Sequence, residues 1–179
     1  DAGERAARAL ARVQALVGSD AVLVPEWRGG RAPAEQYRLV PLDGVDLAAR
    51  SVPGGEPWPG RIPTPSPAVV WSRPGAAEVL DAQGRRVGVS GRGLISSAPV
   101  RCRVGPGDSN VGWSQVRAWA GPWCVEERWW DALAHRRRAR IQVVLAPEGG
   151  RPAMAHPSHG VAHLLTLEDG RWWVEATYD

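Results

Sequence analysis

The sequence contains no lysine and no phenylalanine, although 22 of its 179 residues are basic. All 22 are therefore arginine, and this bias, with the abundance of alanine, glycine, proline and valine, is typical of a GC-rich coding sequence. Arginine suits phosphate and carboxylate recognition through its planar fork. The formal net charge is only +3, so the basic balance alone is weak evidence for a nucleic-acid partner.

Long apolar runs are also missing. No stretch approaches the ~20 apolar residues that span a bilayer, and the first residues lack the charged-then-apolar order of a signal peptide. Cys102 and Cys124 are too few for a disulfide framework and are interpreted as buried thiols, with a pair between neighbouring strands as the alternative. We expect a cytoplasmic protein that does not contact the membrane.

Catalytic motifs are absent from the sequence. It contains no GxSxG, no Walker phosphate loop, no HExxH and no paired CxxC. The "GRG" at 91–93 lacks the strand–loop–helix setting of a phosphate site. We therefore expect a non-enzymatic chain without a cofactor.

The first part of the chain predicts one helix and two strands. Apolar residues recur at helical spacing over 4–17, and Gly18 is placed to end the helix. Short strands are expected at 21–27 and 37–40. Residues 50–67 are rich in proline and glycine and form either a free linker or an arm packed on a surface, as Trp58 and Ile62 suggest. The predicted organisation is 1–49, then this arm or linker at 50–67, then a β-rich interaction domain at 68–179.

Beyond residue 67 the pattern is mainly strand and turn. Strands are expected at 68–71, 77–81, 85–91, 99–104 and 140–146. A hairpin is predicted with its turn at 120–122, and "EDGR" (168–171) carries the Asp-Gly signal of a second. After it, alternation places Trp172, Val174, Ala176 and Tyr178 on one face. The predicted fold is α+β and predominantly β: a small antiparallel barrel or curved sheet with an N-terminal helix and a Pro-rich connecting arm.

Three histidines raise the question of a metal. His156, His159 and His163 could meet around zinc, but Pro157 and Gly160 argue against a shared helix and no fourth ligand is evident. The stretch is better interpreted as a loop entering a strand, and no metal site is predicted.

Four of the ten tryptophans lie in "AWAGPWCVEERWWD" (118–131), followed at once by "HRRRAR". Aromatic faces next to arginines can hold single-stranded nucleic acid. Aromatic residues paired on one face of a sheet more often pack its core, and an arginine run is most often a solvated face or loop. The tryptophan group can therefore be a platform that stacks nucleic-acid bases, a docking face for another protein, or part of the sheet core, and all three interpretations remain open.

Six segments together carry a resemblance to a known family, in order and spacing and over nearly the whole chain. They are "ARALARVQALVGSDAVLVPEWRGGRAPAEQYRLVPL", "PWPGRIPTPSPAVV", "AEVLDAQGRRVGVSGRGL", "AWAGPWCVEERWWD", "RRRARIQVV" and "DGRWWVEATYD". With these segments the chain resembles the C-terminal region of the ImuB family, polymerase-like adaptors related to the Y-family of translesion DNA polymerases.

The resemblance implies a role in a DNA-damage-induced mutasome and a location at the nucleoid during the damage response. ImuB-like proteins bring together a RecA-related accessory protein (ImuA-like), an error-prone replicative-type polymerase and the sliding clamp. The family's clamp-binding peptide lies upstream of the matched region, so clamp binding is not expected of this chain. The C-terminal region is associated with contacts to the accessory protein and the polymerase.

We therefore expect a non-catalytic protein-interaction domain, with an auxiliary single-stranded DNA-binding module as the alternative. Tryptophan and arginine tend to dominate binding energy at interfaces. The candidate partner-binding residues are Trp119, Trp123, Trp129, Trp130, Arg136, Arg137, Arg138, Arg140 and Trp173.

Overall fold

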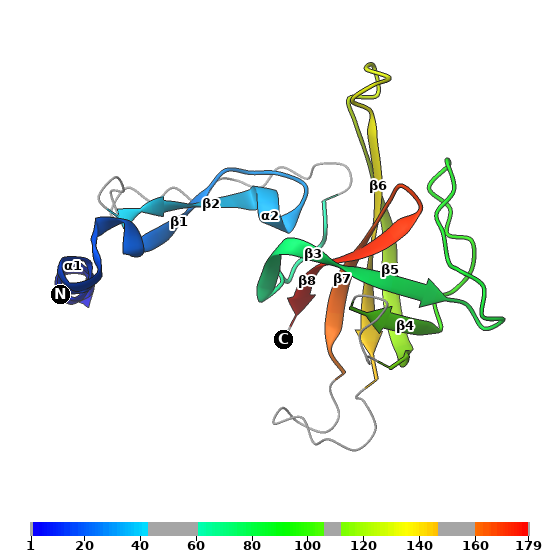
Figure 1. Ribbon diagram of the computed structural model, residues 1–179, viewed down its shortest axis with the longest axis horizontal. Helices are drawn as coiled ribbons and strands as arrows, with labels where there is room; N and C mark the ends of the chain where they lie inside the picture. The colour runs from blue at the N-terminus through cyan, green and yellow to red at the C-terminus, as the bar shows by residue number, and fades with distance from the viewer. Residues whose placement is uncertain (1, 43–60, 106–111, 147–159, 179) are drawn as a thin grey trace. The chain divides into compact units, whose positions relative to one another are not determined.

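The computed structural model describes residues 2–42, 61–105, 112–146 and 160–178 (Figure 1). Contacts divide the chain into two units, Asp1–Pro57 and Trp58–Asp179. The molecule is mostly β, with a closed ring of six antiparallel strands, a separate two-stranded sheet and an N-terminal helix. This confirms the predicted fold class and, within it, the small antiparallel barrel.

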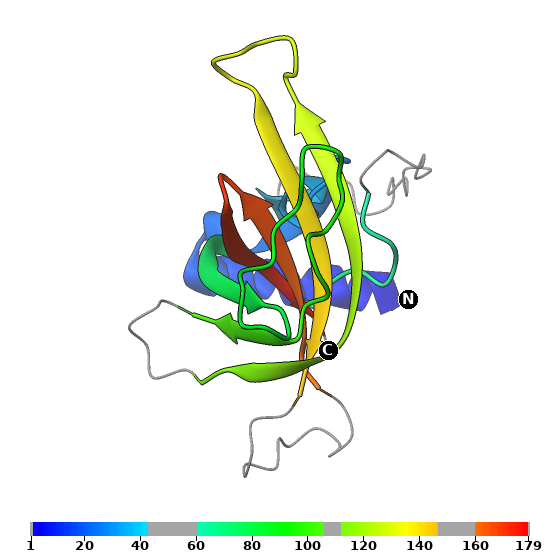
Figure 2. The same cartoon turned by 90° about the vertical axis from the view of Figure 1, so that its right-hand side faces the viewer.

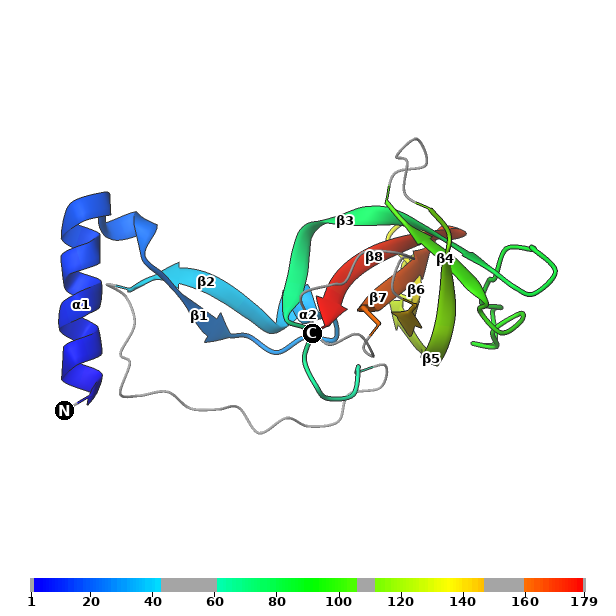
Figure 3. The same cartoon turned by 90° about the horizontal axis from the view of Figure 1, so that it is seen from below.

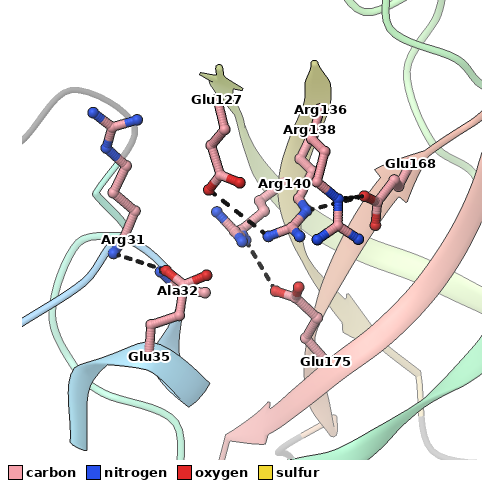
Figure 4. A network of polar contacts seen from close by, with 9 residues as sticks. All are labelled: Arg31, Ala32, Glu35, Glu127, Arg136, Arg138, Arg140, Glu168 and Glu175. Carbon is pink, nitrogen blue, oxygen red and sulfur yellow. Dashed lines mark hydrogen bonds and ion pairs between the residues drawn. The ribbon is translucent and has the colours of Figure 1, made fainter. Parts of the chain in front are cut away.

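The first unit contains the predicted helix and strand pair. Its elements are α1 (Ala2–Val17), the 3-10 turn η1 (Ser19–Ala21), β1 (Leu23–Trp27), α2 (Pro33–Gln36) and β2 (Tyr37–Pro41). Gly18, with φ +99°, follows α1, as its position in the sequence predicts. β1 and β2 pair antiparallel. The Glu35 carboxylate accepts hydrogen bonds from the backbone N–H groups of Arg31 and Ala32 at the start of α2 (Figure 4). No helix that the structure describes has the length and apolar character needed to cross a membrane.

The second unit is an up-and-down barrel. Its strands are β3 (Val69–Leu80), β4 (Arg101–Val104), β5 (Ser114–Glu127), β6 (Arg136–Leu145), β7 (Ala162–Glu168) and β8 (Arg171–Tyr178). Each strand pairs antiparallel with the next, and β8 pairs with β3, which closes the ring (Figure 3). Asp169 (φ 51°) and Gly170 (φ 73°) form the predicted tight turn between β7 and β8.

The segment between β3 and β4 returns to the barrel core. The sequence "AQGR" (82–85) predicts a turn after β3, and the structure has it: Asp81 accepts hydrogen bonds from the backbone N–H groups of Gln83 and Arg85. Beyond it, only isolated pairs such as Leu80–Arg86 form, so the strand predicted at 85–91 is wrong. Its Val87 is nevertheless buried, and its carbonyl accepts a 2.7 Å hydrogen bond from Trp172 Nε1.

The main core lies inside the ring. Its buried members come from β3, β4, β6, β7, β8 and the segment after β3, and they are Ala77, Val79, Val87, Cys102, Ile141, Val143, Leu145, Leu165, Trp172 and Val174. The two strands expected at 68–71 and 77–81 are in fact the single strand β3. A register shift between Val70 and Gly75 accommodates this strand against β8.

A second cluster corrects the predicted alternation of β8. Ala176 and Tyr178 pack with Ile62 and Leu164, not with Trp172 and Val174 in the main core. The register explains this division, because Leu164 pairs with Ala176 whereas Leu165 pairs with Val174. Glu175 is therefore an extra residue, a β-bulge that reverses the alternation after it.

β5 corrects another prediction. The hairpin with its turn at 120–122 is wrong, because residues 114–127 form one strand that pairs with β6 from Val116 to Glu127. Ala120 pairs with Gln142 and Trp123 with Arg140, so Gly121 and Pro122 form a bulge instead of a turn. Gly121 has φ +109°, a conformation that favours glycine.

Some predictions fall outside the described residues. Trp58 and residues 50–60 of the Pro-rich segment are among them, as are His156 and His159. In the rest of that segment, Ile62 is buried in the second cluster.

Candidate protein-interaction surface

The β5–β6 ribbon extends past the other strands of the barrel, and residues 128–135 connect its two strands at the far end (Figure 2). We call this connection the ribbon loop. Arg128 begins it with φ 51°. The Asp131 carboxylate accepts hydrogen bonds from the N–H groups of Leu133 (3.1 Å) and Ala134 (3.2 Å). The loop thus has an internal turn that fixes its backbone.

The ribbon loop exposes its apolar side chains. Trp129 and Trp130 are each 73% exposed, and Leu133 is fully exposed. The two indoles meet edge to face with their ring centroids 5.8 Å apart. Of the three interpretations of this tryptophan group, the sheet core is therefore wrong for Trp129 and Trp130, because they follow β5 rather than lie in it.

The remaining candidate tryptophans lie on strands. Trp119 is exposed, whereas Trp123 and Trp173 are half-buried. The buried indole of the main core is that of Trp172, which was not a candidate. The structure therefore places Trp129 and Trp130 together and leaves Trp119, Trp123 and Trp173 on the barrel strands.

The arginine run lies on β6, and each of its four arginines has a carboxylate partner. Figure 4 shows three of them, Arg136, Arg138 and Arg140. Arg136 Nε and Arg138 Nε share the Glu168 carboxylate, at 3.0 and 3.2 Å. Arg137 Nε lies 3.6 Å from Glu126, and the Arg137 guanidinium also donates to the carbonyls of Ser90 and Gly91. These partners lower the charge that the run could offer to phosphates.

Arg140 is different from the rest of the run. Its side chain is 1% exposed, and its Nε donates to the Glu175 carboxylate over 2.9 Å. The interpretation of the run as a solvated face or loop is wrong for this residue. A buried, paired arginine supports the packing of β6 against its neighbours and is not available to a partner.

Sequence reasoning missed a second basic group. Arg86, Arg103 and Arg171 line a cleft of about 340 Å³ together with Glu78 and Trp172. These residues come from four segments of the chain, and Arg171 and Trp172 are distant from the other three residues in the sequence. No local motif identifies them, since only barrel closure brings β3, β4 and β8 together.

The structure also bears on metal and thiol chemistry. His163 Nδ1 lies 3.1 Å from Thr177 Oγ1, and burial lowers the pKa of this histidine. No group of three potential metal ligands occurs within residues 2–42, 61–105, 112–146 and 160–178.

Cys102 and Cys124 are both free thiols, so the alternative of a disulfide between them is wrong. Burial raises the pKa of Cys102 to about 12, which keeps it an unreactive thiol.

Comparison with protein-family models, with curated proteins and with solved structures finds no match for this chain.

Proposed function

We propose that this chain is a non-catalytic protein-interaction domain, the C-terminal part of an ImuB-like mutasome adaptor. Its partners are an ImuA-like, RecA-related accessory protein and an error-prone replicative-type polymerase, in DNA-damage-induced translesion synthesis in the cytoplasm. The sliding clamp would contact a region upstream of this chain. The resemblance of the sequence supports the assignment to an ImuB-like adaptor. The exposed ribbon loop supports a role in binding other proteins.

The observation that carries the proposal is the exposed pair Trp129 and Trp130. Tryptophan buries a large area at little conformational cost and is enriched among the residues that dominate protein interfaces. Exposed Leu133 lies three residues beyond Trp130 on the same loop. An adjacent group of large apolar side chains, held by the Asp131 turn, is suited to insertion into a pocket of a partner.

The distribution of charge favours a protein over DNA. Three of the arginines, Arg136, Arg137 and Arg138, are held by glutamates, and Arg140 is buried. Neutralised arginines release few counterions from a phosphate backbone. The Trp129–Trp130 pair nevertheless has the chemistry of a base-stacking platform, so single-stranded DNA is the second candidate.

A binding experiment tests the leading proposal. The purified 179-residue chain is immobilised and challenged with the purified ImuA-like protein, the polymerase and, as a negative control, the sliding clamp. We expect capture of the accessory protein, the polymerase or both, and at least tenfold weaker binding by the double variant Trp129→Ala/Trp130→Ala, as is typical of interface hot spots. Absence of capture of both partners would contradict the proposal.

A matched control separates loss of contact from loss of structure. Leu94 is a large, exposed apolar residue in the segment between β3 and β4, so Leu94→Ala removes a similar kind of surface elsewhere in the unit. We expect this variant to bind as the parent does. Anisotropy with a labelled single-stranded oligonucleotide tests the second candidate, which predicts affinity that falls steeply with salt and requires the two indoles.

A further inference from the structure

The cleft next to the start of β8 is lined by both cationic and apolar side chains. Ala77 and Val79 of β3 line it with buried Trp172 and half-buried Trp173. Because Trp172 Nε1 already donates to the Val87 carbonyl, this indole is held in place by the barrel. The cleft can therefore accept an apolar side chain against a fixed aromatic wall.

The lining of this cleft carries more positive than negative charge, with three arginines and one glutamate. Arg86 and Arg103 both pair with Glu78, so one carboxylate serves two guanidinium groups. Arg171, the third arginine of the lining, makes no ion pair with any residue that the structure describes. In addition, Arg103 Nε is buried and has no hydrogen-bond partner among the residues that the structure describes. Such a donor is costly to bury unless an acceptor joins it.

A second cleft, of about 490 Å³, adjoins the first and shares Arg171 and Trp173 with it. His135 and Arg136 also line it, and they follow the apolar residues of the ribbon loop in the sequence. Its Glu168 carboxylate is already shared between Arg136 and Arg138. The two clefts thus run from Trp172 to the base of the ribbon loop.

We infer that these clefts bind an acidic, extended segment of the partner protein, with one carboxylate at Arg171 and an apolar side chain against Trp172 and Trp173. This rests on the proposed function, because it takes the ligand to be a protein. The segment would lie beside the ribbon loop, so both sites engage one partner. Guanidinium–carboxylate pairs are short and charge-assisted, which gives such a contact direction as well as affinity.

Nucleic acid fits this surface less well. Glu78, Glu168 and Asp169 lie among the arginines of the two clefts. A nucleic-acid strand carries a phosphate at every nucleotide and would meet these carboxylates along its path. A peptide can place single carboxylates at the arginines and neutral residues beside the glutamates.

The test uses the full chain and a defined probe. The probe is the fluorescein-labelled, amidated peptide Gly-Glu-Leu-Ser-Asp-Gly, which has neutral residues between its two acids, and its counterpart has Gln and Asn in place of the acids. We expect anisotropy to report binding of the acidic peptide only, and a Kd raised about tenfold by Arg171→Gln. The Nε–H resonance of Arg103 should shift as the acidic peptide saturates the protein.

The matched control is Arg117→Gln. Arg117 is an exposed arginine of β5 that lines neither cleft, so its removal changes the net charge equally and should leave the Kd unchanged. Equal weakening by both variants would show a general charge effect and overturn the inference. So would the absence of binding up to about 1 mM peptide, the range of the weakest specific contacts.

Two further results separate this inference from the proposed function. A thymidine oligonucleotide that binds and loses affinity with Arg171→Gln, while the peptide does not bind, would assign the clefts to nucleic acid and overturn the inference. If the partner proteins are captured through Trp129 and Trp130 but the peptide does not bind, the proposed function stands and the cleft inference fails.

Discussion

Arg140 Nε donates to the Glu175 carboxylate over 2.9 Å, and Glu175 is the bulged residue of β8. The pair connects β6 to β8 across β7, since Arg140 pairs in register with Thr166 and Thr166 with Trp173. The Arg140 side chain is 1% exposed, and its Nη1 and Nη2 have no partner among the described residues. Glu175 is therefore the counter-charge on which a buried guanidinium depends.

Removal of Glu175 should destabilise the barrel strongly. Glu175→Ala leaves the Arg140 charge buried without compensation, and loss of one member of a buried pair typically costs about 3–5 kcal/mol. Urea denaturation measures the free energy of unfolding. Glu126→Ala is the matched control, because Glu126 is half-exposed and lies 3.6 Å from Arg137, and an exposed pair contributes about 0–1 kcal/mol. Similar losses in the two variants would contradict this role of the Arg140–Glu175 pair.

The β5 bulge predicts a specific requirement for glycine. Gly121 has φ +109°, and a Cβ there would lie 2.7 Å from the Arg140 carbonyl oxygen. Gly121→Ala should therefore lower the melting temperature, with a backbone strain of about 1–3 kcal/mol in addition to the clash. Gly88→Ala is the control, since a Cβ at Gly88 meets nothing within 4 Å. A Gly121→Ala variant as stable as the Gly88→Ala variant would rule out this account of the bulge.

His163 lies at one end of a hydrogen-bonded chain. Trp71 Nε1 lies 3.3 Å from Thr177 Oγ1, which in turn lies 3.1 Å from His163 Nδ1. An indole N–H can only donate, so the Thr177 hydroxyl accepts from Trp71, and its second lone pair and its own proton can each serve the imidazole. Burial disfavours the charged imidazole and thereby lowers the pKa of His163.

This arrangement predicts a pH dependence of stability. With the folded pKa of His163 below the unfolded value of 6.5, the unfolded chain binds a proton that the folded chain does not. The free energy of unfolding should therefore fall as the pH drops through about 6.5 and continue to fall until the folded pKa is reached. His163→Gln should flatten urea-denaturation midpoints between pH 7 and 5, whereas His135→Gln, at an exposed position, should not. An unchanged slope in His163→Gln would contradict the prediction.

The sequence predicts the barrel well because much of its signal is local. Alternation in β4 places Cys102 in the core, as observed. The Asp169–Gly170 turn is recognisable because both residues must adopt positive φ. Gly18 likewise marks the end of α1. In each case one residue or a short pattern has a single favoured conformation.

The errors arise where one residue type serves two geometries. Gly121 and Pro122 suit a turn as well as a bulge, and only the pairing with β6 distinguishes them. The bulge at Glu175 has no glycine or proline to mark it, so strict alternation assigned Ala176 to the wrong cluster. The alternation of apolar and polar residues predicts which side chains face the core only as far as the first register shift, because each shift by one residue moves the following side chains to the other face.

The sequence identifies tryptophans and arginines as candidate partner-binding residues, but it does not give the exposure of each side chain. For the arginines, exposure depends on partners that are distant in the sequence. Glu168 and Glu175, which hold Arg138 and Arg140, lie 30 and 35 residues farther along the chain. Arg171 joins Arg86 and Arg103 only because β8 pairs with β3 in the closed ring. These are long-range consequences of topology and have no signature in a short window.

The ribbon loop provides a final prediction, in which Asp131 acts on binding without contacting the partner. Its carboxylate accepts the N–H groups of Leu133 and Ala134 and so orders the backbone that carries Trp129 and Trp130. Asp131→Ala removes the oxygen that accepts both hydrogen bonds, and we expect several-fold weaker capture of the ImuA-like protein or polymerase because binding must then order the loop. The melting temperature should not change, since the loop adds nothing to either core cluster.

Asp131→Asn gives the decisive comparison, because its amide oxygen retains an acceptor at the same position. This variant should bind nearly as the parent does, although it lacks the charge. If Asn and Ala variants lose affinity equally, the carboxylate charge and not the turn is responsible, and the account of a preorganised loop is wrong. Calorimetric titration of the three proteins against one partner resolves the two explanations, since a disordered loop makes the binding entropy less favourable.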